Sequence, residues 1–419
     1  MSAGTTSSVT APPLSRVGAP GEGTWSGWIN VVVAAVVMLA TLPGRTQGLG
    51  LITEPMLRDL QLDRVTYAGI NLWATLLGAA ICLPIGRLFD RVGLRNATAV
   101  LTLLLAAVVW TMSGLAGGAL ALFLLVLGTR ALGQSALSVA SITAVGKSFD
   151  RRVGVAMGVY AVLLSVLFAV AFLAVGASVR VSGWRVAWAQ VAVGLVVLAA
   201  PVALLLRERA TAMADETADP AGTTGLPLIK ALRTPAFWVF AGGTSLFGLA
   251  SSGLGLFNEA VLAERGFDQP TFVTFLAATS GIALVGQLGC GWLTLRWAMP
   301  RLLGVAMLLY AVGLAALPLL TSRAQLWIFA VLIGLSGGMV TVIFFAVWRR
   351  AYGARHLGRI QGAAQMLTVL ASAIGPLIFA QSASRTGSYA TALWTLAACV
   401  LLLGAAAFRT SLPDRGVGV

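Results

Sequence analysis

Charged residues are scarce in this chain. They make up 10% of its 419 residues, hydrophobic residues make up 58%, and the mean hydropathy is +0.91. Soluble domains carry about 25% charged residues, so the composition excludes a soluble fold. It predicts a protein with many membrane-spanning segments.

Residues for metal, redox or nucleophilic chemistry are also few. His356 is the only histidine, and Cys82, Cys290 and Cys399 all fall in apolar runs, which leaves no material for a zinc site, a histidine triad or a disulfide framework. A phosphate-binding Gly-Lys-Thr loop is missing, so ATP is not expected to supply energy. We therefore expect neither an enzyme nor a cofactor.

The formal net charge of +14 is not concentrated in one part of the chain. The 28 basic residues are scattered between apolar runs, without an aromatic-studded basic stripe, which excludes a nucleic-acid-binding protein. The lipid bilayer and a small solute are the partners that such a sequence predicts, and we expect a monomer.

Twelve apolar runs are long enough to cross a bilayer, which takes about 20 residues each. The expected spans are 28–53, 66–86, 97–115, 119–143, 153–177, 184–206, 235–261, 271–294, 301–320, 325–347, 358–382 and 389–408. Nineteen Lys and Arg lie on the side of the two termini and seven on the other, so the positive-inside rule predicts that both termini are cytoplasmic. The expected location is a bacterial-type inner or plasma membrane. Two remain within spans, Arg45 and Arg130.

An internal repeat divides the chain. At an offset of 205 residues, GLGLITEPML (48–57) aligns with GLGLFNEAVL (253–262), and the alignment continues to the loop after the second and eighth spans. Two six-helix halves of the same membrane orientation follow, which is the symmetry of rocker-type transporters. The expected divisions are a disordered tail (1–27), an N-terminal bundle (28–206), a linker (207–234), a C-terminal bundle (235–408) and a short tail (409–419).

A motif after the second span carries a family resemblance. The segment from Gly86 to Arg95, GRLFDRVGLR, resembles the signature of the major facilitator superfamily at every defining position. That resemblance implies an all-α membrane protein with twelve transmembrane helices in two pseudo-symmetric six-helix bundles. We expect Gly86, Asp90, Arg91, Gly93 and Arg95 to form a cytoplasmic latch, through tight turns and hydrogen bonds at a helix N-terminus. Arginines that only anchor topology are the alternative.

Arg45 is the first candidate for substrate binding. A charge within a span costs at least about 2.5 kcal/mol, so it should face a wet cavity or a partner. Arg45 and the Gly-rich stretch after it resemble bacterial relatives of the monocarboxylate carriers, which implies an anion anchor, with Thr41 and Gln47 nearby. The alternative is a structural ion pair with Glu54 or Glu259.

Polar stripes on other spans extend the candidate site. Arg130 and Gln134 lie on one face of the fourth span, Asn71 and Thr75 on the second, and we expect them to contact substrate or to bind neighbouring helices. In the eleventh span Gln361, Gln365, Thr368 and Ser372 follow helical spacing. Such a stripe lines a cavity or holds helices together.

Glu54 and Glu259 occupy equivalent positions near the ends of the first and seventh spans. A buried carboxylate there could carry a proton, whereas an interfacial one would not. The predicted function is a secondary transporter with alternating access for a small organic anion, most plausibly a monocarboxylate, with proton symport. The alternatives are an importer or exporter of neutral or amphipathic solutes such as sugars or drugs, and a membrane sensor or receptor that does not transport.

Overall fold

A computed structural model describes residues 25–80, 89, 92–146, 148, 153–206, 226–353 and 357–413. These residues form helices from end to end. The N-terminal elements are α1 (Trp25–Ala40), η1 (Leu42–Gly44), α2 (Thr46–Gly50), α3 (Thr53–Leu60), α4 (Arg64–Ala80), α6 (Leu94–Ser113), α7 (Ala119–Thr129), η2 (Arg130–Leu137), α8 (Ser138–Gly146) and α9 (Val153–Leu205). The C-terminal ones are α10 (Leu228–Leu232), α11 (Pro235–Ala263), α12 (Gln269–Leu293), α13 (Met299–Ala316), η3 (Leu317–Leu319), α14 (Arg323–Tyr352), α15 (Leu357–Thr386) and α16 (Ala390–Arg409).

Nine helices within the described part of the chain are long and apolar enough to cross a membrane. One of them, α9, turns at Gly183, whose φ of 82° is open to glycine without strain, and it contains two of the expected spans. The shorter α1 and α4 overlap the first two expected spans, and each begins two or three residues before its span. The described helices thus agree with the predicted all-α, twelve-span fold.

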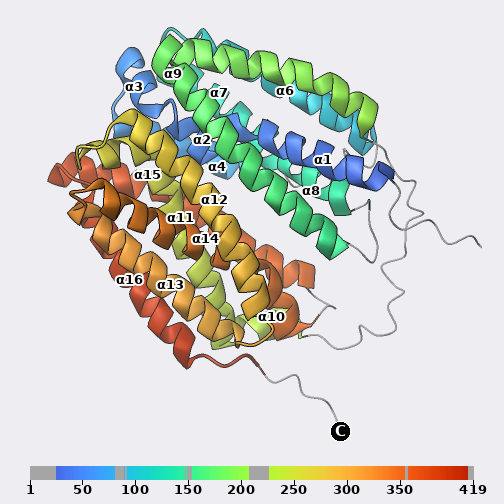
Figure 1. Ribbon diagram of the computed structural model, residues 1–419, viewed down its shortest axis with the longest axis vertical. Helices are drawn as coiled ribbons and strands as arrows, with labels where there is room; N and C mark the ends of the chain where they lie inside the picture. The colour runs from blue at the N-terminus through green and yellow to red at the C-terminus, as the bar shows by residue number, and fades with distance from the viewer. Residues whose placement is uncertain are drawn as a thin grey trace, which may run out of the picture.

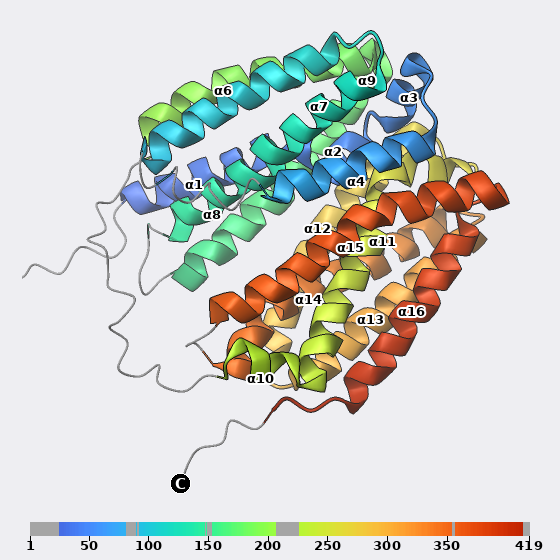
Figure 2. The same ribbon diagram turned by 180° about the vertical axis from the view of Figure 1, so that it is seen from behind.

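The helices gather into two groups, α1–α9 and α11–α16 (Figures 1 and 2). Within the first group α6 packs on α9, and within the second α13 packs on α16. Between the groups α2 and α3 contact α11, α4 contacts α15, and α9 contacts α12. We call the end with the loops after Leu60, Gly183 and Gly266 the distal end, and the opposite one the terminal end.

Both views show the two groups close together around α2, α3 and α11 and diverging toward α8 and α10 at the terminal end. Short polar caps fix the helices that start at the distal end. Asp63 accepts hydrogen bonds from the backbone and hydroxyl of Thr66, and Asp268 accepts one from the backbone of Thr271. The hydrogen bond from the Thr66 hydroxyl holds the pKa of Asp63 below its usual value. The side chain and then the backbone of Thr271 lower the pKa of Asp268 in the same way. The two caps are equivalent positions of the repeat.

Candidate functional site

The first span is broken where the site begins. After α1 ends at Ala40, the segment Leu42–Gly44 makes a tight turn before α2 starts. Gly44 is required there, because a Cβ at this position would lie 2.1 Å from the carbonyl oxygen of Thr129 on α7. The turn places Arg45 at the start of α2, beside the interior of the protein.

Arg45 is held by weakly polar neighbours rather than by a carboxylate. Its Nε donates to Thr41 Oγ1 at 2.7 Å, and one terminal nitrogen donates to Ser138 Oγ at 3.4 Å and lies 2.8 Å from Met38 Sδ. The guanidinium also lies over the ring of Phe168, 5.3 Å from its centre. The predicted alternative, an ion pair with Glu54 or Glu259, is wrong, because Glu54 pairs with Arg64 at 2.7 Å and the partners of Arg45 among the described residues include no carboxylate.

Arg130 has a different environment. It is 2% exposed and donates to the carbonyl of Gly44, the hydroxyl of Thr46 and the amides of Gln134 and Asn71, over distances of 2.6–3.1 Å. These bonds join the break in the first span to α4 and η2. Arg130 therefore acts as a brace between three spans.

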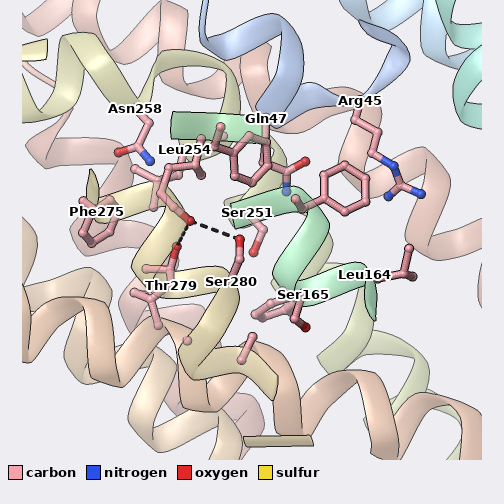
Figure 3. A pocket seen from close by; sticks show the side chains of 18 of the residues that line it. Arg45, Gln47, Leu164, Ser165, Ser251, Leu254, Asn258, Phe275, Thr279 and Ser280 are labelled. Atoms are coloured by element: carbon pink, nitrogen blue, oxygen red, sulfur yellow. Dashed lines mark hydrogen bonds between the residues drawn. The ribbon is translucent and has the colours of Figure 1, made fainter. Parts of the chain in front are cut away.

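A cavity of about 370 Å³ lies between the two groups of helices (Figure 3). Arg45 is the one charged side chain among the described residues that line it. Four phenylalanines, Phe168, Phe172, Phe247 and Phe275, form much of its apolar wall. Neutral polar groups complete the lining: Gln47, Ser165, Ser251, Asn258, Thr279 and Ser280. The cavity thus combines one cation with an aromatic and hydrogen-bonding interior.

The two predicted proton carriers, Glu54 and Glu259, both lie near the distal end, and of these two only Glu54 has an ion-pair partner among the described residues. Glu54 accepts two hydrogen bonds from Arg64, at 2.7 and 3.1 Å. Glu259 is partly buried, and its Oε2 lacks a hydrogen-bond partner among the described residues. The charged groups that act on it are Glu54 and Arg58, both from α3. The arrangement leaves a carboxylate at the interface of the two groups without a cation bonded to it.

A sequence model of the major facilitator superfamily matches residues 33–376. The chain belongs to that superfamily. This membership makes it a multi-pass membrane transporter rather than an enzyme. No curated protein sequence matches this chain.

Solved structures of other superfamily transporters share the fold. A bacterial homolog of the human lysosomal transporter Spinster, in an inward-facing and unoccupied conformation, matches with a TM-score of 0.76 and 16% identity, over 95% of this chain and 100% of that one. The nucleoside transporter NupG matches with a TM-score of 0.70 and 12% identity, over 91% of this chain and 98% of that one. At these identities the likeness establishes the fold alone.

The predicted site residues fall into two sets, those at the cavity and those away from it. Arg45 and Gln47 line the cavity, and Thr41 orients Arg45. The others are not among the described residues that line it: Asn71, Thr75, Arg130, Gln134, Gln361 and Gln365. Instead, the side-chain oxygens of Asn71 and Gln134 accept hydrogen bonds from Arg130. Their roles in substrate binding stay predictions.

The stripe on the eleventh span contributes to helix packing. Thr368 lies 3.3 Å from the hydroxyl of Thr244 on α11, and a Cβ at Gly248 of α11 would lie 2.6 Å from Ser372 Oγ. This part of the stripe fits the interpretation that polar groups hold α11 and α15 together.

The predicted latch is described only in part. Gly86, Asp90 and Arg91 lie outside the described residues. Gly93 precedes α6 with a φ of 85°, and the Nε of Arg95 donates to the carbonyl of Ala203 on α9. The latch stays a prediction.

Sequence reasoning missed the aromatic wall and most of the C-terminal polar lining. Phenylalanine is as common on lipid-facing surfaces as in cavities, so Phe168 and Phe275 give no signal by type. Asn258 did offer one, because an amide within an apolar span is costly to bury and should mark a contact.

Proposed function

We propose that the chain is a secondary transporter of an organic anion, working by alternating access, with Arg45 as the anchor for a carboxylate. The observation that supports this proposal most directly is that Arg45 lines the cavity and has no carboxylate partner among the described residues. Uncompensated charge within a membrane is expensive, and an anionic cargo would offset it. A planar guanidinium also matches a carboxylate with two parallel hydrogen bonds.

The proposal extends to topology and energy source. We place both termini in the cytoplasm of a bacterial-type inner membrane, with six-helix bundles at 28–206 and 235–408 joined by the linker 207–234. In this arrangement the described contacts between the bundles close the distal, external side. A monocarboxylate remains the proposed cargo class, with a proton as co-substrate carried by Glu259 or Glu54.

Replacing Arg45 tests the anchor. Arg45→Gln should weaken binding of a carboxylate about 10- to 100-fold, since a hydrogen bond to a charged group contributes about 1.5–3 kcal/mol. Arg45→Lys should restore only part of the affinity, because an ammonium lacks the fork of the guanidinium. Ligand-induced thermal shifts of the purified protein measure both effects.

The same experiment judges the alternatives. An Arg45→Gln protein that binds carboxylates normally would contradict the anion anchor and favour a neutral solute, which the amide and hydroxyl lining would also accommodate. Counterflow in proteoliposomes separates a carrier from a sensor, because only a carrier exchanges labelled for unlabelled solute.

A further inference from the structure

The two sides of the cavity differ in hydrogen-bonding character. Arg45, from α2, offers only donors. Figure 3 places it on one side of the cavity, with Asn258 of α11 and Thr279 and Ser280 of α12 across from it. The character of this second side constrains the part of the cargo that lies away from its carboxylate.

The hydroxyl groups of Thr279 and Ser280 on α12 both donate their hydrogens to the backbone of their own helix. Thr279 Oγ1 donates to the carbonyl of Leu276 at 2.9 Å, and Ser280 Oγ donates to the same carbonyl at 3.1 Å (Figure 3). A hydroxyl carries one hydrogen and two lone pairs, so both groups keep acceptor capacity. Toward the cavity they act as acceptors.

Asn258 adds an acceptor that has no partner. Its side chain is 4% exposed and lines the cavity, yet its Oδ1 receives no hydrogen bond from any described residue. Rotation of the terminal amide by 180° exchanges oxygen and nitrogen at the same place, so the oxygen can meet a donor in the cavity. In that orientation the oxygen accepts from a donor on the cargo, and this hydrogen bond stabilises the bound cargo.

Aromatic rings line the cavity beside these polar groups. Phe247 packs against Tyr310 with ring centres 4.7 Å apart and planes tilted by 47°, and Phe275 stacks on Phe329 at 5.3 Å, so both cavity-lining rings have an aromatic neighbour. Rigid rings favour a flat apolar body over a flexible polar one. At about 370 Å³ the cavity belongs to the size range of sites for drug-sized ligands, well above the volume of a two- or three-carbon acid.

We infer that the cargo is an aromatic carboxylate with a hydroxyl group at the end opposite the carboxylate, bound by Arg45 at one end and by Asn258 and Thr279 at the other. This inference rests on the proposed function and narrows its substrate class. A hydroxyl suits the acceptor side better than an ammonium does, because no carboxylate lies among the described lining residues to balance a second charge.

Three matched probes test the inference: 3-(4-hydroxyphenyl)propanoate, 3-phenylpropanoate and 3-(4-methoxyphenyl)propanoate. The first can donate at the far end, the second has no polar group there, and the third can only accept. With the full-length purified protein, calorimetry should show the hydroxyl compound binding about tenfold more tightly than the phenyl compound, which corresponds to one neutral hydrogen bond. The methoxy compound should bind most weakly, since it places acceptors against acceptors.

Variants assign the preference to residues. In Asn258→Leu and in Thr279→Val, the preference for the hydroxyl compound over 3-phenylpropanoate should fall to about threefold or less, because each variant removes one acceptor from the far side of the cavity. Thr341→Val is the matched control, because Thr341 is exposed on α14 and also bonds only its own helix, at Gly337. It should keep the full preference.

The outcomes separate this inference from the proposed function. If Arg45→Gln weakens all three probes and the hydroxyl gives no advantage, the hydroxyl inference is wrong and the anion anchor stands. If none of the probes binds, or if Asn258→Leu and Thr279→Val both keep the full preference, the inference is likewise overturned. If Arg45→Gln leaves all three affinities intact, the proposed function fails with it.

Discussion

Arg45 and Arg130 are both arginines within spans, yet their surroundings give them different tasks. Arg130 donates to four oxygen atoms from three segments of the chain. Two of these oxygens belong to the side-chain amides of Asn71 and Gln134. Arg45 has two hydroxyls, a sulfur and an aromatic ring, and it faces a cavity. The first set gives both terminal nitrogens of a buried guanidinium neutral acceptors within the protein, although its Nε has no partner among the described residues. The second set leaves the guanidinium of Arg45 able to bind a group that enters the cavity.

Loss of Arg130 should therefore lower stability. Arg130→Met removes the donors to the Gly44 carbonyl and the Asn71 amide, so we expect a loss of about 2–4 kcal/mol in the free energy of unfolding. Arg130→Lys should fall between this variant and the natural protein, because one ammonium cannot reach all the acceptors. Chemical denaturation in detergent measures this, with Arg45→Gln as the control that should unfold near the natural protein. An Arg130→Met protein as stable as the natural one would show that the brace contributes nothing.

At the scale of single residues, charge within an apolar run was the dependable signal. It singled out Arg45, and the neighbouring Gln47 came with it. The pairing of Asn71 with Arg130 could not be predicted, because it depends on how three spans cross. The same holds for Phe168, whose place over Arg45 is set by the turn at Gly44 and the packing of α9.

Among the elements, the first and seventh spans share a break at equivalent positions. Ile52 (φ −114°, ψ −4°) and Phe257 (φ −110°, ψ 19°) depart from helical geometry at the repeat offset of 205. Just before these breaks the two spans cross at their glycines, and a Cβ at Gly50 would lie 2.2 Å from the carbonyl oxygen of Gly255. The repeated Gly-Leu-Gly-Leu segment is thus one of the contacts that hold the two groups of helices together toward the distal end, beside those of α4 with α15 and of α9 with α12.

A side chain at Gly50 should hold the distal end apart. In a cysteine-free background, Gly50→Val combined with Ser165→Cys should label faster with an impermeant maleimide from the distal side, because the cavity becomes reachable there. The matched control is Gly69→Val on α4, where a Cβ would have no neighbour within 4 Å. Equal labelling of the two variants would count against the glycine contact as the closure.

Element positions followed from hydropathy, and their interruptions did not. The expected span 235–261 corresponds to α11 at Pro235–Ala263, which begins at a proline preceded by the capping Thr234, a signal visible in sequence. The π-helix η2 (Arg130–Leu137) and the breaks at Ile52 and Phe257 gave no such signal in the sequence. They depend on close contacts between spans, which the pattern of one segment does not contain.

For the whole molecule, the informative departure from symmetry is at the distal carboxylates. Glu54 is paired with Arg64, whereas the position equivalent to Arg64 is Gln269, which donates to the carbonyl of Gly176 instead. Glu259 consequently lacks the cation that its counterpart has. For the proposed proton symport, this difference favours Glu259 over Glu54 as the proton carrier.

Proton coupling should depend on Glu259 more than on Glu54. Glu259→Gln should abolish accumulation driven by a pH gradient while exchange of substrate for substrate continues, because the amide imitates the protonated acid but releases no proton. Glu54→Gln should keep accumulation, and Gln269→Arg should reduce it by supplying the missing cation. Proteoliposome uptake with and without the gradient measures all three, and unchanged accumulation in Glu259→Gln would remove this residue from the mechanism.

The crossing of Gly50 with Gly255 bears on the ancestry of the chain. The two residues are equivalent positions of the repeat, so their contact lies on the two-fold axis that relates the halves. A surface that meets its own equivalent is the mark of a self-complementary dimer, in which one gene supplies both partners. Six helices with this segment would have been able to associate before they were fused into one polypeptide. The copies have since diverged at the cavity, where Arg45 has Ala250 as its counterpart at the repeat offset, so that only one half supplies a charged wall.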